Sequence, residues 1–181
     1  MKNFIISLCS ALFLAFNANA LNIDPENTLV MQLKDGAVTI AMYPDVAPNH
    51  VARIKQLARQ GFYDGLKFHR VINGFMAQTG DPLGNGTGGS GQKLKAEFNN
   101  KHHGRGTVSM ARAADPNSAD SQFFICFADA GFLDGQYTVW GQVIDGMEIV
   151  DKIKRGSGSN GEVIDPDTII SLKVLADIKK Q

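Results

Sequence analysis

The fold of this chain is decided by the segment Phe68-His69-Arg70-Val71-Ile72-Asn73-Gly74-Phe75-Met76-Ala77-Gln78. It contains two short apolar or aromatic runs separated by Asn-Gly, a pair of residues that is typical of a turn between strands. Comparable runs occur at residues 121–125 and 137–140, within a stretch that is repeatedly broken by glycine, proline and asparagine. The pattern predicts that residues 68–141 form short strands and turns.

Upstream of this segment, alternating apolar residues predict a β-hairpin at residues 29–42. The alternation is interrupted at Asp35-Gly36, a pair that favours a tight turn because both residues tolerate positive φ angles. The alternating apolar positions are Leu29, Met31, Leu33, Val38, Ile40 and Met42. Downstream, residues 168–175 are predicted to form a final strand.

Two helices are predicted from their boundaries and apolar faces. The first begins at Pro48, because proline is favoured at the first helical position, and ends at Gly61. Its apolar face consists of Val51, Ile54 and Leu57. The second begins at Asp145, which resembles a capping box with Glu148, and ends at Gly156. Many strands with only two helices favour a closed, mostly antiparallel β-barrel capped by those helices, because closure removes exposed sheet edges.

The first twenty residues have the features of a cleaved secretory signal peptide. Lys2 precedes an apolar run from Phe4 to Phe16, and Ala18-Asn19-Ala20 matches a cleavage site. The run is shorter than the roughly 20 apolar residues of a membrane-spanning helix, which disfavours the alternative of an uncleaved anchor. We expect residues 21–181 to form one domain without a membrane span.

The charge and cysteine content argue against several kinds of partner. The chain has 18 basic and 18 acidic residues, and of these only Lys2 lies in the leader. So balanced a chain has no strong field to attract nucleic acid or anionic lipid. Cys126 is the one cysteine left after cleavage, so we expect no intramolecular disulfide.

The sequence lacks the usual motifs for cofactor binding and covalent catalysis. The glycine-rich stretch 80–91 has neither the lysine nor the following helix of a phosphate-binding loop, and no serine stands in a G-x-S-x-G motif. Metal-ligand spacing with cysteines or carboxylates is absent around the four histidines, His50, His69, His102 and His103. We therefore expect no metal and no cofactor.

Several motifs resemble those of the cyclophilins and follow the same order along nearly all of the mature chain. They are the segment 68–78, Gly80-Asp81, Ser109-Met110-Ala111, residues 121–125 and Phe132-Leu133-Asp134-Gly135. The resemblance implies a peptidyl-prolyl cis/trans isomerase that binds proline-containing peptides in a groove outside the barrel. It also implies a closed eight-stranded antiparallel β-barrel capped by two α-helices, and we expect a monomer.

The resemblance also implies roles for individual residues, with Arg70 at the position of the catalytic arginine. The residues that match the proline pocket are Phe75, Met76, Phe124 and Leu133. Those that match the rest of the substrate groove are Gln78, Gln122, Ala111 and Arg112, of which the last two pair with the substrate through their backbone. Arg112 stands where many members carry asparagine.

Two further groove residues depart from the cyclosporin-sensitive members of the family. Phe132 stands where those members carry tryptophan, and Tyr137 stands where they carry histidine. Because the indole N–H is lost, we expect weak cyclosporin binding. Neither change removes the arginine or the apolar pocket, so we expect catalysis to persist.

These residue types suit rotation about an X-Pro bond. The barrier to amide rotation is about 18–20 kcal/mol because nitrogen shares its lone pair with the carbonyl group. No bond is made or broken, so a nucleophile and an acid–base pair are not needed. A permanently charged arginine can donate to the twisting amide, with contacts that strengthen in the transition state.

Two other functions compete with an isomerase of exported, unfolded proteins. One is a proline-peptide-binding chaperone whose turnover is incidental, and the other is a barrel with a hollow interior that carries a small ligand, as lipocalins do. Bulky aliphatic and aromatic alternation argues against a hollow barrel. The leader and the residues at 132 and 137 resemble those of periplasmic bacterial members, so we expect a periplasmic protein, or a secreted one if the source is not Gram-negative.

Overall fold

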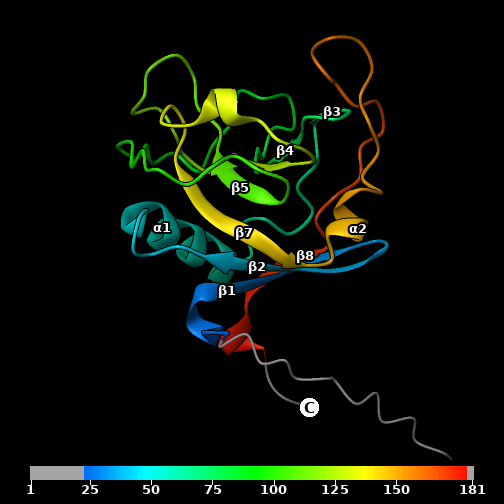
Figure 1. Ribbon diagram of the computed structural model, residues 1–181. Helices are drawn as coiled ribbons and strands as arrows, with labels where there is room; N and C mark the ends of the chain where they lie inside the picture. Colours follow the sequence, from blue (N-terminus) through cyan, green and yellow to red (C-terminus); the bar gives the residue numbers. More distant parts are fainter. Residues whose placement is uncertain (1–22, 179–181) are drawn as a thin grey trace, which may run out of the picture.

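The computed structural model describes residues 23–178, which form eight strands and two α-helices (Figure 1). The strands are β1 (Thr28–Leu33), β2 (Gly36–Met42), β3 (Arg70–Ile72), β4 (Met76–Thr79), β5 (Thr107–Met110), β6 (Phe123–Cys126), β7 (Val139–Asp145) and β8 (Ser171–Val174). The helices are α1 (Pro48–Arg59) and α2 (Met147–Val150), with three 3-10 turns at η1 (Pro25–Asn27), η2 (Gly131–Leu133) and η3 (Leu175–Asp177). The predicted signal peptide, residues 1–20, lies outside the described residues.

No helix within residues 23–178 combines the length and the apolar character that crossing a membrane requires.

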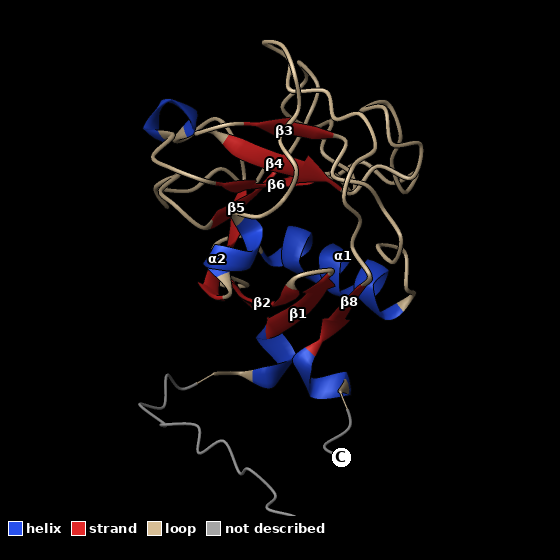
Figure 2. Ribbon diagram, turned by 90° about the vertical axis from the view of Figure 1, so that its right-hand side faces the viewer, coloured by secondary structure: helices blue, strands red, loops and turns tan. Residues whose placement is uncertain are grey.

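The eight strands form one antiparallel sheet in the order β3-β4-β6-β5-β7-β2-β1-β8. The predicted mainly β, eight-stranded antiparallel arrangement is confirmed, but the predicted closure of the barrel is wrong. The end strands β3 and β8 do not pair, and the sheet curves into a half-barrel whose two ends lie at the top and bottom of Figure 2.

Irregular segments take the place of the missing ladder between β3 and β8. The free edge of β3 is covered by residues 156–161, because Val71 N–H donates to the Gly161 carbonyl (2.7 Å) and Gly156 N–H donates to the Val71 carbonyl (2.9 Å). The chain just before β3 meets the chain just before β8, where Lys67 and Thr168 form an isolated antiparallel bridge and the Phe68 N–H donates to the Asp167 carbonyl (2.9 Å). The edges are therefore covered without a continuous barrel, which satisfies the same requirement as closure.

The predicted hairpin forms between β1 and β2, but its turn lies one residue earlier than expected. Leu33 pairs with Gly36, so the turn residues are Lys34 and Asp35. Asp165 is the one non-glycine residue of the described chain with a positive φ, so Asp35 does not adopt the mirror-image turn. Instead Gly36, with φ at 144°, absorbs the unusual backbone conformation at the start of β2.

Both predicted helices are present, and Figure 1 shows them on opposite flanks of the sheet. Helix α1 buries the predicted face of Val51, Ile54 and Leu57 and contacts β8. Helix α2 is shorter than predicted, and the proposed capping box is wrong. Asp145 ends β7, and Gly146 precedes the helix with φ at 83° and no side-chain cap. A Cβ at Gly146 would lie 2.4 Å from the Ala37 carbonyl oxygen, which explains the glycine.

Two separate apolar clusters share the sheet. The inner cluster fills the space between the sheet and the helices, and its largest fully buried side chains are Trp140, Tyr63, Phe68 and Phe123. The outer cluster lies on the other face and contains Met76, Phe124, Cys126, Ala130 and Leu133. Large side chains fill the interior, which argues against the ligand-carrying barrel.

Candidate active site

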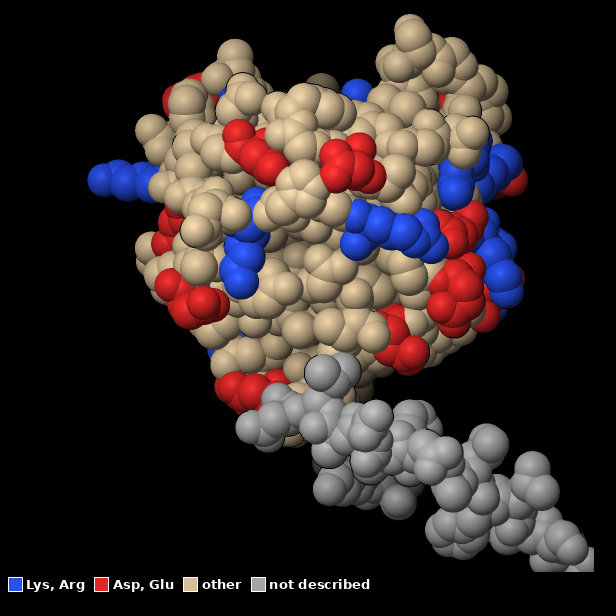
Figure 3. All heavy atoms as spheres, in the orientation of Figure 1, with Lys and Arg blue, Asp and Glu red and all other residues tan. Residues whose placement is uncertain are grey.

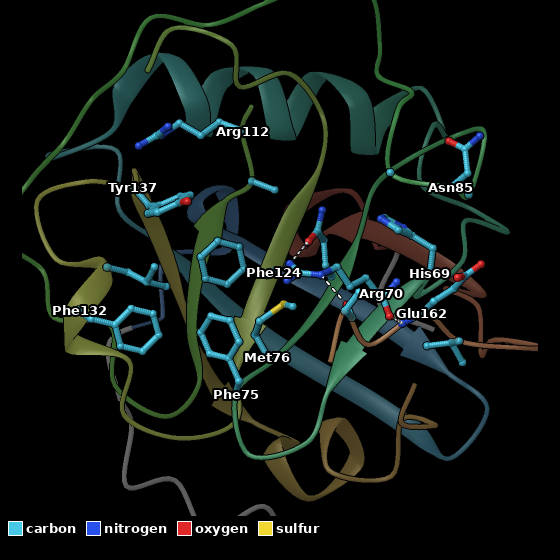
Figure 4. Close-up of a pocket in the computed structure, with 17 residues that line it drawn as sticks. His69, Arg70, Phe75, Met76, Asn85, Arg112, Phe124, Phe132, Tyr137 and Glu162 are labelled. Carbon is cyan, nitrogen blue, oxygen red and sulfur yellow. Dashed lines mark hydrogen bonds between the residues drawn. The ribbon is translucent and has the colours of Figure 1, made fainter. Parts of the chain in front are cut away.

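A groove of about 650 Å³ opens over the outer cluster (Figure 4). It is lined by ten of the eleven predicted site residues, of which nine are Arg70, Phe75, Met76, Gln78, Ala111, Arg112, Phe124, Phe132 and Leu133. The tenth is Tyr137, whereas the eleventh, Gln122, lines a smaller neighbouring cavity of about 300 Å³. The structure thus brings together residues that are far apart in sequence, and strands β3, β4 and β6 provide its floor.

Strand alternation explains why the apolar part of the groove faces outward. On β6, Phe123 and Ile125 point into the inner cluster, while Phe124 and Cys126 point into the outer one. Met76 from β4 is 1% exposed and Phe124 is 5% exposed, so they form a dry floor. Phe75 and Leu133 stand beside this floor, from the β3–β4 turn and from η2. The result is a concave apolar site that is large enough for a proline ring.

Arg70 stands at the first position of β3, at the edge of this apolar floor. Its Nε donates to the Asn160 carbonyl (2.9 Å), and one of its terminal nitrogens donates to Gln78 Oε1 (3.1 Å). Arg70 and Gln78 are cross-strand partners in the β3–β4 ladder, which brings their side chains together. A guanidinium has five N–H groups, so, within the described chain, two are used and the others remain available to a ligand.

A chain of amides links Arg70 to the loop that borders the groove. Gln78 Nε2 donates to Gln122 Oε1 (2.9 Å), and Gln122 Nε2 donates to the carbonyls of Gly86 (3.1 Å) and Gly88 (2.8 Å). Gln122 therefore acts through Gln78 and this loop rather than from the floor of the groove. The arrangement fixes the direction of the Arg70 guanidinium.

Asp81 holds the same loop in place through hydrogen bonds. Its buried carboxylate accepts N–H bonds from Leu83 (2.8 Å), Asn85 (3.0 Å) and Gly86 (2.6 Å). Burial by itself would raise the pKa of Asp81, but the converging N–H groups outweigh it and lower the pKa. The charged form of Asp81 is thus the form that these N–H groups favour.

Arg112 and Phe132 form the rim of the groove. The Arg112 guanidinium lies 4.6 Å over the Tyr137 ring and donates to the Gln136 carbonyl (2.9 Å), and in Figure 4 it lies well away from Arg70. Phe132 is 67% exposed, with its ring 5.4 Å from that of Phe75. Ala111 N–H donates to the Gln122 carbonyl (2.9 Å), which holds this backbone beside the groove.

The far side of the groove contains residues that sequence reasoning missed. His69, Asn85 and Glu162 lie beyond Arg70 in Figure 4, and Asn160 and Val163 also line the groove. From the sequence, His69 has no predicted role in the groove. It is 7% exposed, neither of its ring nitrogens forms a well-aligned hydrogen bond with the described residues, and burial lowers its pKa.

Part of this far side could have been anticipated. His69 immediately precedes Arg70, and β3 begins only at Arg70. Strict alternation therefore need not separate the two side chains, and both reach the groove. Asn160 and Glu162 come from a distant loop that carries no sequence signal. Among residues 23–178, no three histidine, cysteine, aspartate or glutamate side chains are grouped as metal ligands.

The geometry combines an apolar floor with a permanently charged multiple donor at its edge. Such a site can hold a proline ring and offer hydrogen bonds to the neighbouring peptide group. This chemistry requires no electron transfer, no nucleophile and no proton transfer.

Comparisons with known proteins agree with this description. The family described as cyclophilin type peptidyl-prolyl cis-trans isomerase/CLD matches residues 28–174. A probable peptidyl-prolyl cis-trans isomerase of Brucella suis is 52% identical over 190 residues, covering 96% of this chain and 97% of the relative. A peptidyl-prolyl cis-trans isomerase of Synechococcus elongatus is 41% identical and covers 82% of this chain and 96% of its own.

Solved structures also resemble this fold. A cyclophilin from Hirschia baltica has a TM-score of 0.77 at 29% identity, covering 87% of this chain and 77% of that one. A cyclophilin type isomerase from Cryptosporidium parvum, crystallised in the presence of the dipeptide Ala-Pro, has a TM-score of 0.75 at 29% identity and covers 81% of this chain and 98% of its own. The chain belongs to the cyclophilin family and is a peptidyl-prolyl cis-trans isomerase.

Proposed function

We propose that Arg70 is the catalytic residue and that the outer cluster binds the proline ring of the substrate. In this proposal Phe75, Met76, Phe124 and Leu133 hold the ring, while the chain before the proline rotates. Phe132 and Tyr137 add apolar surface at the rim. Gln78, Gln122, Ala111 and Arg112 border the peptide backbone on either side.

The proposed chemistry follows from the electronic structure of the amide. As the X-Pro bond twists, conjugation is lost, the prolyl nitrogen becomes pyramidal and its lone pair becomes an acceptor. The free N–H groups of Arg70 can donate to this nitrogen and to the neighbouring carbonyl oxygen. These bonds are stronger in the twisted state than in the planar one, so they lower the barrier. The apolar floor limits competition from water.

The observation that carries the proposal is the position of Arg70. Its guanidinium is held by the Asn160 carbonyl and by Gln78, and it lies beside the outer cluster with N–H groups to spare. An arginine with only a structural role would be expected to have its donors occupied by carboxylates. No carboxylate of the described residues forms a salt bridge with Arg70.

The test compares exchange and affinity in the same variants. We expect Arg70→Ala to slow catalysed cis/trans exchange of a short X-Pro-Phe peptide by about 10²–10³-fold, measured by NMR, the size of effect seen when one key donor is removed. Peptide affinity should change little, because the apolar floor is intact. Arg70→Lys should restore only part of the rate, since an ammonium lacks the planar fork.

The control and the alternative are distinguished by the same data. Arg59→Ala removes an exposed arginine at the end of α1 and should leave exchange unchanged. If Arg70→Ala keeps full exchange activity, the catalytic role of Arg70 is wrong. If the wild-type protein binds peptide strongly but turns it over too slowly to matter in folding assays, the proline-peptide-binding chaperone is the better account.

We further propose that the substrates are unfolded exported proteins and that the mature chain is a periplasmic monomer, or a secreted one outside Gram-negative bacteria. The support is the sequence of residues 1–20, with its basic start, apolar run and Ala18-Asn19-Ala20. Expression of the full chain in a Gram-negative host, followed by fractionation and N-terminal sequencing, should give a periplasmic product that begins at Leu21. A product that retains Met1 in the membrane fraction would favour the uncleaved anchor.

A further inference from the structure

His102 bridges two aspartates on either side of the turn that forms one wall of the groove. Its Nδ1 lies 2.6 Å from Asp134 Oδ2, and its Nε2 lies 2.5 Å from Asp129 Oδ2. Between these aspartates lies η2, which contributes Phe132 and Leu133 to the groove. The aspartates also hold the turn directly, since Asp129 Oδ1 accepts the Gly131 N–H (3.1 Å). We call residues 129–134 the wall segment.

The wall segment continues inward to the floor of the groove through His103. Asp134 Oδ1 accepts the His103 backbone N–H (2.8 Å) and lies 2.8 Å from His103 Nδ1. The buried His103 ring stacks on Phe124, with centroids 6.2 Å apart, and its Nε2 lies 3.0 Å from Ser109 Oγ. Asp134 is therefore shared between an exposed histidine and a buried one that supports the proline floor.

The two histidines have opposite electrostatic surroundings. Hydrogen bonds to Asp134 and then to Asp129 raise the pKa of His102 above its ordinary 6.5. Burial lowers the pKa of His103, more than its contact with Asp134 raises it. In the neutral ring that burial favours, Nδ1–H donates to Asp134, and Nε2 shares the single hydroxyl hydrogen of Ser109 with the Thr138 carbonyl, which lies 3.0 Å from Ser109 Oγ. Of the two histidines, His102 is thus the one whose charged form the surroundings favour.

Other charged groups near the wall segment do not compete for this role. Lys101 lies over the Tyr43 ring, 4.4 Å from its centroid, and Arg105 pairs with Asp151. Burial, followed by the charges of Asp129 and Asp134, raises the pKa of Cys126 to about 12, so its thiol stays neutral. Arg112 donates to the Gln136 carbonyl (2.9 Å), just past the wall segment, and the two aspartates themselves have pKa values below the ordinary range.

Protonation decides how many aspartates His102 can hold. An imidazolium has two N–H donors and can bridge both carboxylates, whereas a neutral ring has one donor and one lone pair. After deprotonation, one carboxylate oxygen faces the lone pair of a ring nitrogen. His102 then loses its hydrogen bond to that aspartate and no longer bridges the two.

From this geometry we infer that His102 is a positioning residue whose proton holds the wall segment, with Phe132 and Leu133, against the proline floor. The inference rests on the proposed role of the groove as the proline site. Substrate binding should be tightest while His102 is charged. The contribution of the His102 charge to substrate binding is complete below the ordinary histidine pKa. It is lost as the pH rises through the raised pKa that His102 has in the folded protein. His102 does not contact Arg70, so kcat should not change with the protonation of His102.

The test measures KM and kcat for an Ala-Pro-Phe peptide from pH 6 to pH 9 by NMR exchange. In the wild type we expect KM to rise about two- to fivefold across the titration of His102, the effect of one exposed ion pair, with kcat unchanged. His102→Gln has no charge to lose and should show the higher KM at every pH. His102→Arg remains charged and can reach both aspartates, so it should keep the lower KM up to pH 9.

Two further variants separate positioning from general charge effects. Asp129→Asn removes one partner and should move the inflection of KM, and the NMR titration of His102, to lower pH. Asp45→Asn removes an exposed carboxylate that has no side-chain partner among the described residues, and it should leave both unchanged.

The outcomes that would overturn the inference are specific to His102. The inference is wrong if the wild-type KM stays constant from pH 6 to pH 9 while NMR shows that His102 titrates within that range. It is also wrong if the KM of His102→Gln changes with pH at the same point as that of the wild type. A pKa of His102 at or below 6.5 would show that the two aspartates do not stabilise its charged form. None of these results depends on Arg70→Ala. Failure of the catalytic role proposed for Arg70 can therefore be distinguished from failure of the positioning role inferred for His102.

Discussion

The two apolar clusters of this protein are built from the same strands but serve different purposes. The inner cluster is enclosed by the sheet and the helices, and its residues are almost completely buried. The outer cluster is open along one side, and it is completed by half-buried residues such as Phe75 and Tyr137. Its support is polar: His103 stacks on Phe124, and the Gln78–Gln122 chain fixes the border. Stability should depend mainly on the inner cluster and substrate affinity on the outer one.

Adjacent residues of β6 test this division most strongly. Phe123 is fully buried and makes edge-to-face contacts with Tyr63 and Trp140, at 5.6 and 5.5 Å between centroids. We expect Phe123→Ala to lower the free energy of unfolding by about 3–5 kcal/mol. The molecules that remain folded should keep the wild-type KM. Urea unfolding and NMR exchange provide the two measurements.

The matched variant is Phe124→Ala, one residue along the strand. The space it leaves opens onto the groove, so water can enter, and we expect a loss of about 1–3 kcal/mol in unfolding free energy. KM should rise by about tenfold or more, since the proline ring loses an apolar contact. Equal effects of both variants on KM would contradict the division into two clusters.

A smaller effect on substrate affinity is expected from a substitution in the loop that borders the outer cluster. Asp81→Asn replaces a carboxylate that accepts three backbone N–H groups, and we expect it to cost about 1–3 kcal/mol. It should also raise KM, because the Gly86 and Gly88 carbonyls that bind Gln122 lie in this loop. The inner cluster is not touched, so the near-ultraviolet signal of Trp140 should be unchanged.

The pH dependence of the same variant gives an independent check. The pKa of Asp81 is lowered in the folded protein, so its contribution is present above its ordinary pKa of 3.8 and is lost as the pH falls through the lower, folded value. The wild type should therefore lose stability in acid in a step that Asp81→Asn lacks. Identical acid unfolding of the two proteins would show that the charge of Asp81 is not needed.

The smallest effect on stability is expected at the rim. Phe132 is 67% exposed, so Phe132→Trp should change the unfolding free energy by less than about 0.5 kcal/mol. The new indole N–H can donate to cyclosporin, and we expect its affinity to rise about two- to tenfold from a weak starting value. Calorimetric titration of both proteins measures this. An unchanged affinity would mean that position 132 does not limit binding of the drug.

Much of the fold could be predicted because periodicity reports which residues face the interior. The first hairpin, α1 and the antiparallel character of the sheet follow from alternation and helical spacing. The face of a strand that becomes a binding site could not be predicted in this way, because Phe123 and Phe124 are equally apolar. The resemblance to a family supplied that distinction, and the structure brings the expected residues together.

The errors have a common origin in contacts between distant segments. Closure of the barrel was predicted from the need to cover sheet edges, but residues 156–161 cover β3 by irregular hydrogen bonds instead. The Asp145 cap failed because the close approach of Ala37 demands a left-handed glycine at 146. Likewise, Asn160 and Glu162 reach the groove from a loop with no periodic pattern. Sequence periodicity carries no information about such approaches.

The two ends of the described chain lie side by side, and this has a practical consequence. Near the chain ends, η1 contacts η3, and Arg59 pairs with both Glu26 and Asp177. Figure 1 shows both ends at the bottom of the molecule, away from β3 and β4. A short linker could join them into a circular permutant, or the whole unit could be inserted into a surface loop of another protein. Either construction would leave the groove open, so the isomerase could serve as a cassette that is tethered from one side.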